Sequence, residues 1–300
     1  MNTPRNIPAS VRQRLLNLAR KEQRPFTELL QYYAMERFLY RLSESVHAAR
    51  FVLKGAMMML IWRMSEFRPT KDIDVLGRTA SNEAGIIAQI REILVTDVQA
   101  DGLSFDPDSI ISERITQEAE YKGIRILFRG ALDNARIRMQ LDIGFGDVVY
   151  PEPRELNLPA LLDYPSPKLL CYSMESTIAE KFEVLVKRGI LNSRMKDFHD
   201  IWALSRQFDF RITPLAEAIR LTFSKRKTIL LFEIEAFSES FTEAKQAQWT
   251  AFLKRTRLDH VPASFSEITS AIKTFLLPVV IVVLSEKNES NNWIAPGPWS

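Results

Sequence analysis

The fold is decided by two stretches, Leu53–Ala56 (LKGA) and, after an apolar run, Arg68–Leu76 (RPTKDIDVL). Side chains at positions i and i+2 of a strand point to the same face, so Asp72 and Asp74 present two carboxylates side by side. Ile73 and Val75 then take the opposite, buried face. Two carboxylates this close repel each other, and one stays protonated unless a cation lies between them. The second stretch therefore predicts a divalent-metal site on a strand.

A second acidic strand is indicated by residues 136–145, where apolar and polar residues alternate strictly. Alternation of this kind is typical of a half-buried strand, and residues 124–128 are expected to pair with it through a turn at 132–134. Asp142 lies on the polar face. We expect Asp72, Asp74 and Asp142 to form a three-carboxylate site for Mg²⁺ or Mn²⁺, because Mg²⁺ prefers carboxylate oxygens and the phosphates of its substrate.

The turn at Lys54-Gly55-Ala56 is expected to lead from a strand into a helix and to lie beside a bound nucleotide. Gly55 and Ala56 are small, and a bulkier side chain there would block the approach of a triphosphate to backbone N–H groups. Lys71 and Arg68, beside the acidic pair, either neutralise it or contact the triphosphate. Each of these signals is weak when taken alone.

Composition limits the class of protein. The chain has 300 residues, enough for two domains, and Cys171 is its one cysteine, which excludes an internal disulfide and a cysteine metal cluster. The N-terminal residues have no apolar core typical of a signal peptide. The longest apolar run, residues 275–284, is about half the length of a membrane span, and we expect it to be buried. These features predict a cytoplasmic protein with no membrane partner.

Charge is spread unevenly over the chain although the net charge is only +3. Residues 1–50 hold nine basic against four acidic residues, and residues 181–230 hold eleven against five. These two segments could form positive surfaces for a polyanion, or they could be solvated helix faces.

The pattern along the chain predicts four parts. Residues 1–50 form helices that pack on the core, split near Arg24-Pro25, with Ser10 as the first cap. Residues 51–165 form the sheet domain and end in a proline-rich, irregular connection. Residues 166–284 are helical, with breaks near Gly189, Pro214 and Pro262, and residues 285–300 form a polar, loosely packed tail.

The order of these motifs resembles the AbiEii/AbiGii nucleotidyltransferase toxin family. The resemblance rests on FVLKGAMMML, RPTKDIDVL, QLDIGFGD and ESTIAEKFEVLVKRGILNSRMKDFHDIWAL, with LTFSKRKT and QWTAFLKR further on, and covers about residues 10–279. It implies an α+β fold of the DNA polymerase beta type, with a mixed sheet that carries the acidic residues, flanking helices and a helical C-terminal domain. It also implies a toxin of a toxin–antitoxin or abortive phage infection system.

Carried over by position, the resemblance places the turn at Gly55 and Ala56, the metal ligands at Asp72 and Asp74, and a hydroxyl at Thr70. Many members have Gly-Gly or Gly-Ser at the turn, and Ala56 cannot donate a side-chain hydroxyl. Nucleotide binding is therefore expected from Lys54, Gly55, Ala56, Thr70, Lys71 and Lys181.

The further family motifs fall on Lys181 and on the pair Asp197 and Asp200. On its helix Lys181 lies beside the apolar face, so it either reaches past that face to water or faces a cleft; the resemblance favours a phosphate-binding role. Asp197 and Asp200 are one helical turn apart and are expected to orient Lys181, cap a neighbouring helix or position the acceptor. The alternative is a surface salt bridge with Lys196 or Arg194.

The function predicted is metal-dependent transfer of a nucleoside monophosphate from an NTP to RNA, with catalysis by Asp72, Asp74, Asp142, Lys181, Asp197 and Asp200. The resemblance implies the 3′ end of tRNA as the acceptor. A DNA-binding antitoxin is the expected partner. Two alternatives stay open: a protein or small-molecule acceptor, and a nucleotide-binding regulatory protein with little catalysis.

Overall fold

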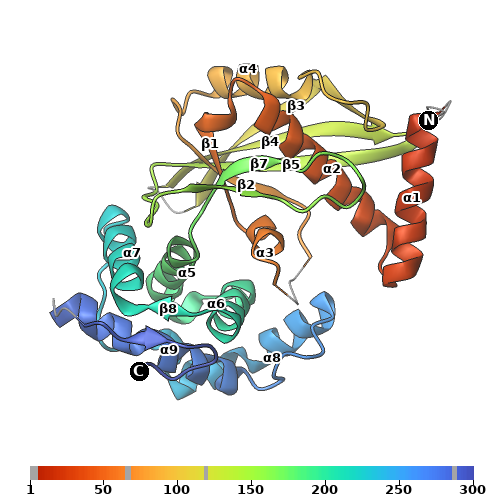
Figure 1. Cartoon of the computed structure of the whole chain (residues 1–300). Coiled ribbons are helices and arrows are strands. Elements are labelled where there is room, and N and C mark those ends of the chain that lie inside the picture. Colours follow the sequence, from red (N-terminus) through yellow and green to blue (C-terminus); the bar gives the residue numbers. More distant parts are fainter. Residues whose placement is uncertain (1–5, 65–68, 118–120, 286–288) are drawn as a thin grey trace. The chain divides into compact units, whose positions relative to one another are not determined.

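A seven-stranded mixed sheet organises the first of two compact units in the computed structural model, which describes residues 6–64, 69–117, 121–285 and 289–300 (Figure 1). The sheet unit comprises Met1–Gly146 and Arg154–Cys171, and the helical unit comprises Asp147–Pro153 and Tyr172–Ser300. The α+β prediction, with a mixed sheet and a helical C-terminal part, is confirmed.

The sheet unit contains α1 (Ile7–Glu22), α2 (Phe26–Glu44), a 3-10 turn (Ala48–Arg50), β1 (Phe51–Lys54), α3 (Met57–Ile61), β2 (Ile73–Gly77), α4 (Glu83–Leu94), β3 (Leu103–Gln117), β4 (Tyr121–Leu132), β5 (Ala135–Phe145), β6 (Arg154–Asn157) and β7 (Lys168–Cys171). The strand order is β3-β4-β5-β2-β1-β7-β6. The pairs β2–β5 and β1–β7 are parallel, and the other neighbours are antiparallel. The two strands that carry the acidic residues, β2 and β5, are therefore neighbours near the middle of the sheet.

One face of the sheet is buried under helices. Ile73 and Val75 on β2 and Leu141 and Ile143 on β5 are at most 1% exposed and belong to one apolar cluster with residues of α2 and α4. Figure 1 shows α2 and α4 over the sheet. Because side chains alternate along a strand, the carboxylates of the same strands lie on the other face.

The helical unit contains α5 (Met174–Arg188), α6 (Met195–Gln207), β8 (Phe210–Arg211), α7 (Ile212–Lys225), α8 (Glu239–Thr256), α9 (Phe265–Ser285) and β9 (Asn292–Trp293), with 3-10 turns at Gly189–Leu191 and Glu235–Phe237. Its core is aromatic: Phe182, Phe198, Trp249, Phe265 and Phe275 are all fully buried.

Helix α9 holds the apolar run that we expected to be buried. Among the described residues it is the one helix long and apolar enough to cross a membrane, which is weak evidence because core helices pass the same test. It packs on α6, α7 and α8, and Phe275, Leu276, Val279 and Val280 are not exposed. Five of the ten residues of the run are buried, four are half-buried and Ile281 is 40% exposed, so the expectation of a buried run holds in part.

Three local predictions are wrong. The first cap is Asn6, whose Oδ1 accepts the Ala9 N–H, and not Ser10, which lies inside α1. The proline-rich segment includes β6, and residues 168–171, which we placed in the helical part, form β7. In both cases a strand of four residues is too short to show a period in the sequence.

The C-terminal segment is not loosely packed where it is described. Asn292–Trp293 pairs with Phe210–Arg211, and the Trp293 indole donates to the Ser205 carbonyl oxygen at 2.6 Å. The Trp299 indole donates to the carbonyl of Phe275 at 2.8 Å. Two tryptophans thus fix a segment that its polar composition suggested would be loose. Residues 286–288 lie outside the described residues.

Candidate metal and nucleotide site

The three predicted metal ligands come together on β2 and β5. The parallel pairing of the two strands places Asp74 directly beside Asp142, and Asp72 precedes β2 by one residue. Each of the three carboxylates offers an oxygen within 4.8 Å of the others, and each side chain is half-buried. This set of oxygen donors, within reach of solvent, fits a hard divalent cation such as Mg²⁺ or Mn²⁺.

A row of charged residues crosses the sheet at the level of these ligands. Strand register aligns Lys54 (β1), Asp74 (β2), Asp142 (β5), Arg125 (β4) and Glu113 (β3). Residues paired directly across neighbouring strands share a face, so the row places positive charge on both sides of the carboxylates.

Arg125 is a site residue that sequence reasoning missed. Its Nε and one terminal nitrogen each donate to a different oxygen of Asp142 at 2.8 Å, and the Gln140 amide lies 3.2 Å from the same carboxylate. The hydrogen bond to Asp142 raises the pKa of Arg125. The signal was in the sequence, because counting back from the two-residue turn at Asp133-Asn134 places Arg125 opposite Asp142.

Gly55 is required by the position of Asp74. Its φ is +72°, a conformation that side-chain-bearing residues rarely adopt, and a Cβ there would lie 2.1 Å from Asp74 Oδ2. The neighbouring Ala56 has an ordinary φ of −69° at the start of α3 and is buried. The turn therefore brings the backbone against the carboxylate, a close approach that we had expected to serve a triphosphate.

Thr70 holds Asp72 in place. Its hydroxyl donates to Asp72 Oδ1, and its backbone N–H donates to the Tyr32 hydroxyl at 3.0 Å. Thr70 is buried, whereas Lys71 is exposed and Lys54 is half-buried. Arg68 lies outside the described residues. Of the predicted nucleotide-binding residues, Thr70 thus contacts a metal-ligand candidate directly.

Lys181, Asp197 and Asp200 form a second charged cluster, in the helical unit. The Lys181 ammonium on α5 lies 3.1 Å from Asp197 Oδ1 and 2.7 Å from Asp200 Oδ2, both on α6. The two aspartates are each 1% exposed. The pair therefore forms a buried ion-pair cluster with Lys181. The salt bridge with Arg194 that we gave as the alternative is also present, at Asp197, so the role of the two aspartates stays a prediction.

Arg194 and His199 complete this cluster. Arg194 Nε donates to Asp197 Oδ2 at 2.6 Å, and His199 Nδ1 lies 3.1 Å from Asp200 Oδ1. Burial would raise the pKa of Asp197, but the charges of Lys181 and Arg194 outweigh it, and the pKa is lowered. Asp197 is thus a carboxylate kept ionised in the interior by two cations.

Comparison with known proteins gives a family match and two solved structures. The family model of the nucleotidyl transferase AbiEii toxin of type IV toxin–antitoxin systems matches residues 37–271. No curated protein matches the chain. A crystal structure of a candidate nucleotidyltransferase from H. pylori is 13% identical, with 87% of this chain and 98% of the other covered and a TM-score of 0.48. For JHP933 from Helicobacter pylori the identity is 13%, the covered shares are 86% and 94%, and the TM-score is 0.49.

The family match spans most of the chain, and it includes both charged clusters. The chain therefore belongs to the AbiEii family of nucleotidyl transferase toxins of type IV toxin–antitoxin systems.

Proposed function

We propose that the protein transfers a nucleoside monophosphate from an NTP to RNA, with the 3′ end of tRNA as the acceptor. The 3′ oxygen would form a bond to the α-phosphorus, the bond to the β-phosphate would break, and pyrophosphate and the hydroxyl proton would leave. The observation that carries the proposal is the set of three carboxylates with oxygens within 4.8 Å of one another, beside a turn whose Gly55 admits Asp74.

In this proposal Asp72, Asp74 and Asp142 hold Mg²⁺ or Mn²⁺. The bound cation supplies positive charge that favours loss of the hydroxyl proton and stabilises the leaving pyrophosphate. Thr70 fixes the carboxylate of Asp72, and Arg125 fixes that of Asp142. Lys54, Gly55, Ala56 and Lys71 would lie along the nucleotide.

Lys181 would bind a phosphate of the NTP, with Asp197 and Asp200 as its positioning residues. An ammonium group has three N–H donors, and it acts on phosphate as a point charge. Two buried carboxylates restrict where that charge can lie.

The setting of the reaction is also a proposal. We place the protein in the cytoplasm, where NTPs and tRNA are available, and we propose that its antitoxin partner is a DNA-binding protein. A halt in translation would follow from blocked tRNA ends.

The test is incubation of the protein with each α-labelled NTP, Mg²⁺ and total tRNA. We expect labelled tRNA with at least one NTP and a loss of label on the order of 10³-fold in Asp72→Asn, which keeps the shape and removes the charge. Asp133→Asn is the matched control, because Asp133 is an exposed aspartate in a turn with φ +54°, a conformation that asparagine also tolerates.

Equal transfer by Asp72→Asn and wild type would refute the assigned site. Label on protein or on a small molecule, with none on tRNA, would favour the alternative acceptors. Tight NTP binding with no transfer to any acceptor would favour a regulatory role.

A further inference from the structure

A pocket of about 450 Å³ in the helical unit is lined by several hydrogen-bond donors. It lies between the start of α6, with Ser193, Arg194 and Lys196, and one face of α8, with Gln248 and Arg255. Three of its lining residues are cationic and none is acidic. A concave surface of this composition attracts anions.

Arg194 is held in place by a hydrogen bond from one of its three guanidinium nitrogens. Its Nε binds Asp197, whereas its two terminal nitrogens have no partner among the described residues. The side chain is 28% exposed, and Asp197 is buried behind it. The guanidinium therefore offers its terminal donors from a preset orientation, which suits an oxyanion with two acceptor oxygens.

Three further polar side chains line the pocket. In the described part of the chain, the side chains of Arg255, Gln248 and Ser193 form no hydrogen bond or ion pair. Met195, Ala251 and Phe252 supply the apolar part of the lining. The pocket thus combines hydrogen-bond donors with apolar surface. A sugar–phosphate chain fits both, because its phosphate oxygens accept hydrogen bonds and its sugars offer carbon atoms for packing.

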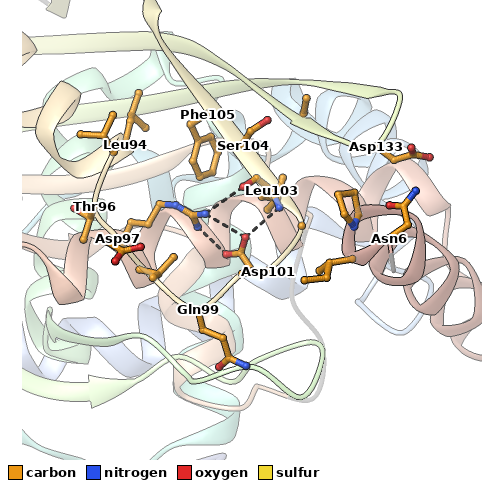
Figure 2. A pocket seen from close by; sticks show the side chains of 18 residues that line it. Asn6, Leu94, Thr96, Asp97, Gln99, Asp101, Leu103, Ser104, Phe105 and Asp133 are labelled. Carbon is orange, nitrogen blue, oxygen red and sulfur yellow. Dashed lines mark hydrogen bonds and ion pairs between the residues drawn. The ribbon is translucent and has the colours of Figure 1, made fainter. Parts of the chain in front are cut away.

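The larger pocket of the sheet unit, about 700 Å³, shows the contrasting case (Figure 2). Its cation, Arg41, donates to both oxygens of Asp101 at 2.7 and 3.1 Å and to the carbonyl of Leu103 at 3.2 Å. Asp101 also accepts the Leu103 N–H. Because these charges satisfy each other, that pocket has no comparable demand for an anion.

We propose that the pocket on α6 and α8 binds a phosphodiester group of the RNA acceptor. This inference rests on the proposed RNA substrate and adds a place where its backbone is held. Asp197 connects the pocket to Lys181, because one of its oxygens binds Arg194 and the other binds Lys181.

The test uses the full chain and a fluorescent tRNA transcript, with binding measured by anisotropy at several salt concentrations. Arg255→Gln should weaken binding by about three- to tenfold and lower the slope of log K against log salt by about 0.7 to 0.9, the value for one lost phosphate contact. The matched control is Lys254→Gln, another exposed cation on α8 that does not line the pocket.

A second pair tests the same point by adding charge. Gln248→Glu should repel the phosphate and weaken binding, whereas Ala247→Glu, exposed on the same helix outside the pocket, should change it by less than about twofold. Poly-glutamate is included as a competitor to represent an acidic protein surface.

The proposal that this pocket binds RNA would be overturned by equal RNA binding of Arg255→Gln and Lys254→Gln. It would also be overturned if the wild type did not bind RNA. Displacement by poly-glutamate at lower concentration than by unlabelled tRNA would overturn it as well, and would indicate an acidic protein partner. The transfer assay with labelled NTP is read separately, so a failed pocket with intact transfer to tRNA leaves the proposed function standing, and absent transfer to tRNA refutes that function by itself.

Discussion

The protein holds two carboxylate clusters of opposite character. Asp72, Asp74 and Asp142 lie half-buried on a sheet face with oxygens within 4.8 Å of one another. Asp197 and Asp200 are each 1% exposed, and cationic side chains contact them. Water and ions can reach the first cluster, although Arg125 already pairs with one of its members, Asp142. The second cluster is buried together with the cations that neutralise it.

The difference separates a binding role from a positioning role. Carboxylates that remain accessible can exchange water for a metal and a substrate. Carboxylates buried against Lys181 and Arg194 instead determine where those cations lie, and removing one leaves a buried charge without compensation. The two clusters should therefore respond differently to the same Asp-to-Asn change.

The largest effect is expected from Asp74→Asn. We expect transfer to fall on the order of 10³-fold or more, because the change removes a metal ligand and keeps its size. The unfolding temperature without metal should change little. In the wild type Mn²⁺ at 100 times its Kd should stabilise the folded state by about 2.7 kcal/mol and so raise the unfolding temperature. In the variant Mn²⁺ should not change the unfolding temperature.

The assignment of a metal-binding role to the sheet cluster would be refuted if Asp74→Asn kept its activity and its stabilisation by Mn²⁺. A large loss of stability without metal would also count against it, since that outcome belongs to the buried cluster.

Asp197→Asn should act mainly on stability. It leaves Lys181 and Arg194 with one fewer buried counter-charge, which costs about 3 to 5 kcal/mol. Urea unfolding at pH 7 measures the change. Glu217→Gln breaks the exposed pair with Arg220 and should cost less than about 1 kcal/mol. Equal costs for the two variants would show that burial does not make the ion pairs of Asp197 costlier to break than an exposed pair.

Much of the sheet around the site could be predicted from sequence. Residues 136–145 alternate strictly, and β5 follows them with Ile137, Met139, Leu141 and Ile143 buried. Apolar residues at helical spacing within residues 83–94 indicate a helix, and α4 has these bounds. Strand β3 was missed because Pro107 and a register shift between Asp106 and Ile111 break its period.

The charge counts misled more than the motifs did. Residues 1–50 are basic in sum, but Arg37 and Arg41 are buried and paired with Glu36 and Asp101. In the second basic segment Arg226 binds Asp147, Glu180 and Glu183. Composition gives the number of charges but not which of them form ion pairs within the fold. The positive surface is therefore smaller than the sums suggested.

Gly55→Ala tests whether the metal-ligand cluster depends on the close approach of the Gly55 backbone to Asp74. The added methyl would collide with Asp74 Oδ2, and the φ of +72° would be strained, so we expect transfer to fall about 100-fold and stability by about 1 to 2 kcal/mol. Ala56→Gly is the control, because its φ of −69° needs no glycine. It should cost about 1 kcal/mol and keep its activity. Similar activities of the two variants would show that Asp74 does not depend on the close approach.

Glu36 is a third kind of carboxylate and should have the smallest effect. It is buried like Asp197 but has one cation, Arg37, and the Leu161 N–H as partners. Burial outweighs these partners and raises the pKa of Glu36 to about 6, from its ordinary value of 4.5. The folded state therefore binds this proton more tightly than the unfolded state. Stability due to Glu36 is fully present below pH 4.5 and should fall by about 2 kcal/mol as the pH rises through 6.

The pH dependence of stability due to Asp197 has the opposite sign, because folding lowers the pKa of this carboxyl group. The stability that Asp197 contributes is present above pH 3.8, its unfolded pKa, and is lost as the pH falls through the folded pKa. Urea unfolding from pH 4.5 to 7 isolates Glu36, since Asp197 stays ionised throughout that range. Glu36→Gln shifts the whole curve by a constant and should remove the decline seen in the wild type. Parallel curves would mean that Arg37 and Leu161, and not burial, decide the charge of Glu36, and that one buried cation holds a carboxylate ionised as firmly as the two around Asp197.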